Sequence, residues 1–127
     1  MTGVVLDASA VLALLFDEAG AESVELVVAG AVMSTVNWVE VCQRLADRRA
    51  PIDHARARLT EAGVELHPLT PADAERAAAL RASTREAGLS LADRCCLALA
   101  DSLGRRAVTA DAAWASLRIG TAVELIR

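Results

Sequence analysis

Residues 4–16, VVLDASAVLALLF, contain the pattern on which the fold prediction depends. The VVL of residues 4–6 is rich in β-branched side chains, which is typical of a short buried strand, and the strand ends at Asp7. Residues 9–16 are mostly apolar and suit a buried helix. A strand followed at once by a helix is the first half of a β-α-β unit.

The same alternation of strands and helices continues to the end of the chain. Four further short strands are predicted over residues 31–33, 64–66, 107–109 and 123–126. Six further helices are predicted over residues 21–28, 37–49, 52–61, 71–85, 90–103 and 112–117. Alternating elements joined by short connections predict an α/β fold, a three-layer α/β/α sandwich with a mainly parallel central sheet.

The length of 127 residues favours one domain over the whole chain, residues 1–127, because two cores would leave each half too small. No repeat or linker divides the sequence. Hydrophobic residues make up 54% of the chain, which excludes an intrinsically disordered protein and exceeds what a small isolated core usually buries. A homo-oligomer or another bound partner is therefore expected.

Neither a membrane segment nor a secretory signal is predicted. The longest apolar run, residues 10–16, is far shorter than the ~20 residues that span a bilayer. Asp7 interrupts the region in which a signal peptide needs an uncharged stretch, and no Lys or Arg precedes it. The expected location is the cytoplasm.

Charge and cysteine content exclude several kinds of site. The net charge of −4 provides no overall basic field for nucleic acid. All 13 basic residues are arginines, which excludes Schiff-base enzymes and Walker-A phosphate loops. The three cysteines are odd in number and lack C-x-x-C spacing, which argues against disulfides and a structural zinc site.

Four acidic residues stand where the predicted elements begin or end. Asp7 follows the first strand, and Asp111 follows the strand at 107–109. Glu40 and Asp93 belong to early turns of helices. Because ligand sites of parallel α/β sheets lie beyond the carboxyl ends of the strands, we expect the four carboxylates to share one pocket.

Each of these acids also has a purely structural explanation, in which it caps a helix or closes a turn. Two of them lie at capping-box spacing, in the pairs Ser90–Asp93 and Asn37–Glu40. Asp111 would be an N-cap, and Asp7 would belong to a turn. Asp73 follows Thr70 at the same spacing and is assigned no catalytic role, so the spacing alone does not indicate catalysis.

The conjunction of four acids favours a metal site, because clustered carboxylates repel one another unless a cation neutralises them. Mg²⁺ and Mn²⁺ prefer such oxygen ligands, and one or two ions would activate a water and stabilise the leaving oxygen of a phosphodiester. This chemistry requires neither His nor Lys. Without these four residues the acids would number 13, equal to the bases, so the whole net charge is attributable to the site.

Four segments carry a resemblance to a known family. They are VVLDASA at 4–10, Glu40 in the helix after Ser34-Thr35, LSLADRCCLALA at 89–100, and TAD at 109–111. Together they resemble the PIN-domain nucleases, and most closely the VapC toxins of bacterial toxin–antitoxin pairs. The resemblance covers nearly the whole chain.

The resemblance implies a Mg²⁺- or Mn²⁺-dependent endoribonuclease that hydrolyses RNA phosphodiesters. It implies that the catalytic and metal-binding residues are Asp7, Glu40, Asp93 and Asp111. It also implies that Ser9 and Thr109 are polar helpers near the metal. As a toxin, the chain would form a homodimer and be neutralised by a small antitoxin protein.

Two arginines near the acids are predicted to bind RNA phosphate, because a guanidinium can hold phosphate through two hydrogen bonds. Arg44 lies four residues after Glu40, and Arg94 directly follows Asp93. The alternatives are an exposed Glu40–Arg44 pair and a solvated Arg94.

Two other functions fit part of the pattern. A catalytically silent PIN-like binding module would keep the acids only as helix caps or as contacts for a partner's arginine. A phospho-acceptor receiver or an aspartyl-phosphate hydrolase also places acids at parallel strand ends. The receiver and the hydrolase would each need a lysine, which this chain lacks. The hydrolase would also need a second Asp where Ser9 stands.

Overall fold

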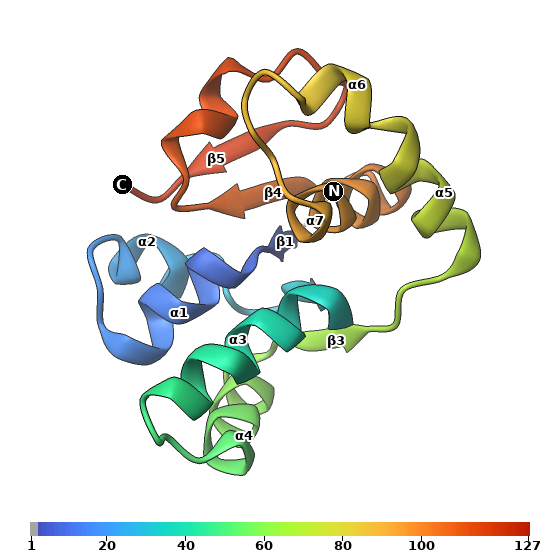
Figure 1. Cartoon of the computed structure of the whole chain (residues 1–127). Coiled ribbons are helices and arrows are strands. Elements are labelled where there is room, and N and C mark those ends of the chain that lie inside the picture. The colour runs from blue at the N-terminus through green and yellow to red at the C-terminus, as the bar shows by residue number, and fades with distance from the viewer. Residues whose placement is uncertain (1–2) are drawn as a thin grey trace.

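The computed structural model describes residues 3–127, and a five-stranded sheet forms its centre (Figure 1). The strands are β1 (Val4–Leu6), β2 (Val32–Ser34), β3 (Glu65–His67), β4 (Arg106–Thr109) and β5 (Val123–Leu125). Their order across the sheet is β3-β2-β1-β4-β5, and each neighbouring pair is parallel. The predicted α/β class and parallel sheet are confirmed.

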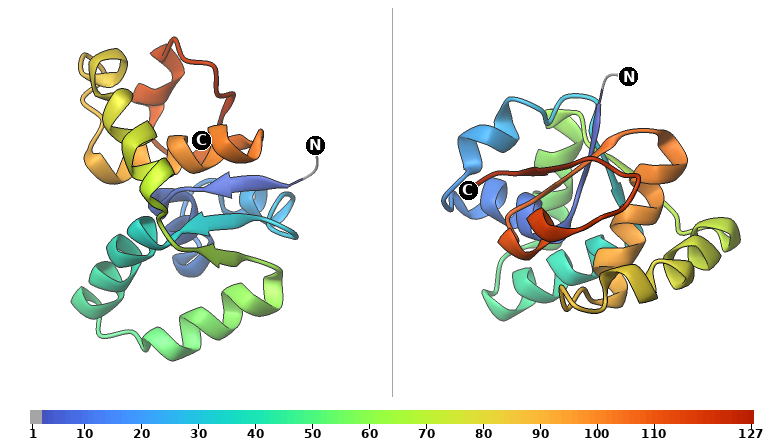
Figure 2. Two further views of the ribbon diagram at one scale, coloured as in Figure 1. Left: turned by 90° about the vertical axis from the view of Figure 1, so that its right-hand side faces the viewer. Right: turned by 90° about the horizontal axis from the view of Figure 1, so that it is seen from above.

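Helices connect the strands and cover both faces of the sheet. The first half of the chain forms α1 (Ala8–Phe16), α2 (Ala21–Glu25), α3 (Thr35–Asp47) and α4 (Ile52–Ala62). The second half forms α5 (Pro71–Ala79), α6 (Arg81–Thr84), α7 (Leu91–Leu103) and the 3-10 helix η1 (Ala112–Ser116). In the right-hand view of Figure 2, α1 and α2 lie on one side of the strands and the α5–α7 segment lies on the other, which gives the three predicted layers.

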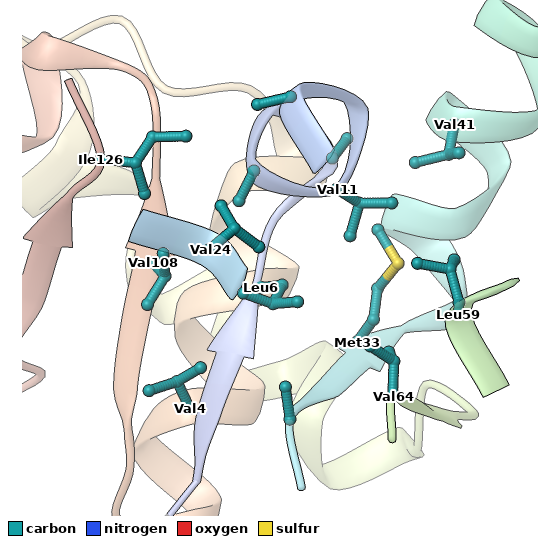
Figure 3. Packing of buried hydrophobic residues seen from close by; sticks show 14 of the residues in the cluster. Val4, Leu6, Val11, Val24, Met33, Val41, Leu59, Val64, Val108 and Ile126 are labelled. Atoms are coloured by element: carbon teal, nitrogen blue, oxygen red, sulfur yellow. The ribbon is translucent and has the colours of Figure 1, made fainter. Parts of the chain in front are cut away.

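Alternate side chains of the strands point to opposite faces and build two cores. Val4 and Leu6 of β1 belong to the cluster that α1 to α4 complete, shown in Figure 3, and Met33 of β2 belongs to it as well. Val5 and Val32 instead join the cluster beneath α7 and η1. Because both faces are covered, β1 is apolar throughout, and β2 is apolar up to Ser34 at its end.

The structure corrects the limits of several predicted helices. The helix expected over 71–85 is interrupted at Leu80, where the chain bends and the Leu80 side chain packs against the second core cluster. The helix expected over 21–28 ends at Glu25, because the amide of Val27 bonds three residues back, to Val24, instead of four. The segment 112–117 forms a 3-10 helix.

The third predicted helix, over 37–49, begins two residues earlier than expected. Ser34 is its N-cap, and the Ser34 hydroxyl oxygen accepts a hydrogen bond from the amide of Val36 at 3.2 Å. The strand β2 therefore passes directly into α3 without a loop. This shift changes the surroundings of Asn37 and Glu40, because Asn37 is the third residue of the helix and not its N-cap.

Among the described residues, no helix has the length and apolar character that crossing a bilayer requires.

Candidate active site

A cavity of about 430 Å³ lies at the carboxyl ends of β1 and β4. The chain runs from β1 outward to β2 and β3 and then returns to the other side of β1 as β4 and β5. Open parallel sheets bind ligands at such a reversal of strand order. The residues that line the cavity are Asp7, Ala8, Ser9, Leu12, Glu18, Glu40, Gln43, Arg44, Asp93 and Asp111. The structure thus brings together all four acids singled out from the sequence.

Asp7 is the most deeply buried of the four acids, with 4% of its surface exposed. It caps α1, since its Oδ1 accepts a hydrogen bond from the amide of Ala10 at 2.9 Å. Its own amide donates to the carbonyl oxygen of Val108 at 3.1 Å, which extends the pairing of β1 with β4. The sheet and the first helix together fix this carboxylate at the floor of the cavity.

The hydroxyl groups of Ser9 and Thr109 hold the Asp7 carboxylate from both sides. Ser9 Oγ donates to Oδ1 of Asp7 at 2.7 Å, and Thr109 Oγ1 donates to Oδ2 at 2.5 Å. Each hydroxyl oxygen also accepts from the backbone after β4, Ser9 from Ala110 and Thr109 from Asp111. The two residues predicted to be polar helpers therefore orient Asp7 and join the ends of β1 and β4.

Asp93 is a helix cap and a cavity residue at once. Its Oδ2 accepts from the amide of Ser90 at 2.9 Å, while Ser90 Oγ accepts from the amide of Asp93 at 3.1 Å, so the predicted capping box is complete. Asp111 likewise caps η1, with Oδ1 accepting from the amide of Ala113 at 3.0 Å. Capping uses one oxygen of each carboxylate in the described hydrogen bonds, so it does not exclude a ligand at the other.

Glu40 is not part of a capping box, and the predicted Asn37–Glu40 box is wrong. Both residues lie within α3, because Ser34 caps that helix. The contact between them runs from side chain to side chain, with Asn37 Nδ2 donating to Glu40 Oε1 at 3.2 Å. Nδ2 also donates to the carbonyl oxygen of Ala92, the residue before Asp93, at 3.1 Å.

Burial makes charge costly on two of the acids, Asp7 and Glu40, and the nearby charge of Asp93 adds to this cost. Burial raises the pKa of Asp7 from its ordinary 3.8 to about 6, with a small further increase from the charge of Asp93 and an opposing effect from the hydrogen bonds. Burial also raises the pKa of Glu40, against the Asn37 hydrogen bond and with the help of Asp93. A cation in the cavity would remove this electrostatic cost.

The two arginines predicted near the acids lie in different places. Arg44 lines the cavity, and the ion pairs found within residues 3–127 do not include the alternative Glu40–Arg44 pair. Arg94 turns away toward α5, where its Nη1 donates to the carbonyl oxygen of Ala77 at 3.0 Å. Arg44 is therefore well placed to meet a phosphate near the acids, whereas Arg94 joins two helices.

The PIN-domain family model matches residues 4–119, which is nearly the whole chain. The chain belongs to the PIN-domain family. No curated protein matches the sequence at a significant level.

Solved structures with the same fold include several toxin–antitoxin proteins. A toxin–antitoxin complex from Klebsiella pneumoniae superposes on this PIN domain with a TM-score of 0.79 at 21% identity, covering 98% of both chains. VapBC2 of Rickettsia felis, solved with a fragment of promoter DNA, has a TM-score of 0.73 at 12% identity, covering 97% of this chain and 98% of its own. VapC20 of Mycobacterium tuberculosis, described as a Sarcin-Ricin loop cleaving toxin, has a TM-score of 0.70 at 19% identity, covering 91% and 96%.

The donor atoms of this PIN domain suit a hard divalent ion. Carboxylate, hydroxyl and amide oxygens line the cavity, and these are the donors that Mg²⁺ and Mn²⁺ prefer. Within the part of the chain that the structure describes, no three Asp, Glu, His or Cys side chains stand close enough to form a complete metal-binding group. In chemistry and charge, a hard divalent ion fits the oxygen donors of the cavity.

The sequence alone did not predict a place in the site for three polar residues, Glu18, Gln43 and Asn37. Glu18 and Gln43 line the cavity, and Glu18 pairs at 3.5 Å with Arg48, the residue that follows α3. Glu18 lies between α1 and α2, and no local pattern marked it. Asn37, by contrast, interrupts an apolar helical stripe, a signal that a correct helix start would have exposed.

Proposed function

We propose that this single PIN domain is a Mg²⁺- or Mn²⁺-dependent endoribonuclease and the toxin of a toxin–antitoxin pair. The observation that carries the proposal is the meeting of four carboxylates, from the ends of β1 and β4 and from α3 and α7, around one cavity. The family supports nuclease chemistry, and the cavity supplies the acids for it. Reaction with RNA would give 5′-phosphate and 3′-hydroxyl ends.

Asp7, Glu40, Asp93 and Asp111 would hold one or two divalent ions. When bound, such ions supply an activated water and neutralise the charge that develops during in-line hydrolysis of a phosphodiester. Ser9 and Thr109 keep the Asp7 carboxylate oriented through hydrogen bonds at both of its oxygens. Arg44 binds a phosphate group of the RNA from the wall of the cavity, where its charge offsets that of the substrate.

The similar structures support the biological role. The names of three of them describe a toxin–antitoxin complex, a VapBC pair and a VapC toxin. By this likeness we propose that the chain acts in the cytoplasm as a homodimer and is neutralised by a small antitoxin protein. Co-expression with a neighbouring small reading frame, followed by purification of the complex, tests the partner.

The nuclease proposal is tested by incubating the purified protein with total RNA in EDTA, in Mg²⁺ and in Mn²⁺, followed by mapping of the cut ends. Cleavage should require a free divalent ion, and EDTA should abolish it. Undiminished cleavage in EDTA would contradict the metal mechanism.

The second candidate function is a catalytically silent binding module. It is favoured by the capping bonds of Asp93 and Asp111, which give both acids a structural role. A silent module would leave RNA intact with every ion tested while still binding its partner, so the same experiment distinguishes the two functions.

A further inference from the structure

The buried face of α3 contains one residue that does not suit it. Three residues spaced by four form this face, Asn37, Val41 and Leu45. The spacing is that of an apolar helical stripe, and two of the three residues are apolar. Asn37, at the head of the stripe, has no exposed surface. A polar amide at a fully buried position lowers stability unless its groups are bonded, so its presence needs an explanation.

The contacts of Asn37 connect two of the cavity acids. Both protons of its Nδ2 group are used, one toward Glu40 Oε1 at 3.2 Å and one toward the carbonyl oxygen of Ala92 at 3.1 Å. Ala92 precedes Asp93 in the first turn of α7. One amide group therefore joins the side chain of one acid to the backbone that carries another.

The remaining polar atom of Asn37 shows that stability alone does not account for the residue. Its Oδ1 is buried and finds no hydrogen-bond partner within residues 3–127. An apolar side chain of similar size would complete the stripe with Val41 and Leu45 and would leave no such atom. Departures of this kind from the local pattern are expected at functional positions.

We propose that Asn37 is a positioning residue for the nuclease reaction, holding Glu40 toward the cavity and fixing its separation from Asp93. The inference rests on the proposed function. A glutamate has three rotatable side-chain bonds, so without a partner its carboxylate samples several positions, whereas metal ligands from two helices need a fixed separation. Loss of a hydrogen bond that orients a metal ligand typically lowers metal affinity or activity by about 10–100-fold.

The variant Asn37→Leu separates positioning from packing. It completes the apolar stripe, so the melting temperature of the metal-free protein should be equal to or higher than that of wild type. The Kd for Mn²⁺, measured by calorimetric titration, should rise by about 10–100-fold. The kcat for RNA cleavage should fall by a similar factor, with KM unchanged because Arg44 is untouched. Retention of the wild-type Mn²⁺ affinity and kcat would overturn the proposal.

Two variants control for folding. Leu45→Val alters the same stripe two turns away from Asn37, so it should lower the melting temperature while leaving Mn²⁺ affinity unchanged. Asn37→Asp keeps the shape of the side chain and replaces its donor with an acceptor facing Glu40. It should lose Mn²⁺ affinity as Asn37→Leu does, and it provides the test if the leucine variant does not fold. Wild-type affinity in Asn37→Asp would overturn the proposal.

A double-mutant cycle tests whether Asn37 acts through Glu40. In a Glu40→Gln background, Asn37→Leu should weaken Mn²⁺ binding no further, and a second loss of the same size would overturn the assignment. Wild-type protein separates this inference from the nuclease proposal. If wild type binds Mn²⁺ and cleaves RNA but Asn37→Leu does so equally well, the positioning role alone is overturned. If wild type does neither, the nuclease proposal fails and the positioning role falls with it.

Discussion

The amino ends of α5 and α7 share a sequence pattern but differ in their surroundings. Thr70 and Ser90 are the caps, and the hydroxyl oxygen of each accepts from the amide three residues later at 3.1 Å. An aspartate occupies that third position in both helices, Asp73 in α5 and Asp93 in α7. The spacing alone therefore assigns both aspartates the same role.

The positions of the two helices in the fold give the aspartates different roles. Asp93 lines the cavity with other acids, because α7 begins beside the carboxyl ends of the strands. Asp73 lies on α5, which packs against α7 (Figure 1), with its Oδ1 4.0 Å from Arg76 Nε. Arg76 in turn pairs with Asp101 of α7 at 2.6 Å. Asp93 thus stands among like charges, whereas Asp73 stands beside an opposite one.

The largest expected difference between the two helix ends is in activity. Asp93→Asn should lower the rate of RNA cleavage by more than about 100-fold, because a metal ligand contributes several kcal/mol to the transition state and each 1.36 kcal/mol is a factor of ten. Asp73→Asn should leave the rate per folded molecule unchanged. Both variants keep an oxygen that can accept at the helix end. Initial rates in Mn²⁺ check this, and equal rates in the two variants would return Asp93 to the role of a cap.

The next largest expected effect is the loss of stability that ionisation of the buried Asp7 causes. Asp7→Asn should reveal this loss when EDTA keeps the protein free of metal. Burial raises the pKa of Asp7 in the folded protein to about 6, above its ordinary 3.8. The contribution of the neutral Asp7 carboxyl to the free energy of unfolding is therefore fully present below pH 3.8, and it is lost as the pH rises through 6. A difference of roughly two pKa units corresponds to about 3 kcal/mol. The asparagine variant has no such group, so the difference in free energy of unfolding between it and wild type should shift in its favour by about 2 kcal/mol from pH 4 to pH 7, because the unfolded carboxyl is already partly ionised at pH 4.

Urea denaturation of both proteins at the two pH values measures this shift. The same difference at pH 4 and at pH 7 would show that the Asp7 carboxylate carries no cost of ionisation in the fold. In that case the cavity would not differ electrostatically from an ordinary helix end.

The smallest expected effect concerns the N-cap hydroxyl groups that the two helix ends share. Thr70→Ala and Ser90→Ala each remove a cap, and each should lower the free energy of unfolding by about 1 kcal/mol. Thermal denaturation of the metal-free variants checks the two values against wild type. A much larger loss at Ser90 than at Thr70 would indicate that the α7 cap supports more than its own helix.

The order of strands and helices was predictable because the apolar segments are short, distinct and separated by Gly, Pro and polar residues. Asp7 and Asp111 were found by one rule, that ligand sites of a parallel sheet lie at its carboxyl edge. The break at Leu80 was not predictable, since it depends on packing against a distant part of the chain. Glu18 reaches the cavity through the tertiary arrangement of α1 and α3, which leaves no local pattern.

The contacts of Asn37 could not be predicted, because the predicted start of its helix was two residues too late. The sequence places Asn37 at a helix start, where an amide is an ordinary cap. Ser34 takes that position in the structure, so Asn37 lies on the buried face and donates to Glu40 and to the carbonyl oxygen of Ala92, the residue before Asp93. The residue types of the site were readable from the sequence, but the contacts that orient them required the three-dimensional structure.

Calorimetric titration of Mn²⁺ into metal-free protein tests the central claim, that the four carboxylates form one divalent-ion site. Wild type and Asp73→Asn should show the same saturable binding, with one or two ions per chain. Asp7→Asn, Glu40→Gln, Asp93→Asn and Asp111→Asn, each folded, should bind at least about tenfold more weakly. Absence of saturable binding in wild type, or wild-type affinity in all four acid variants, would contradict the account.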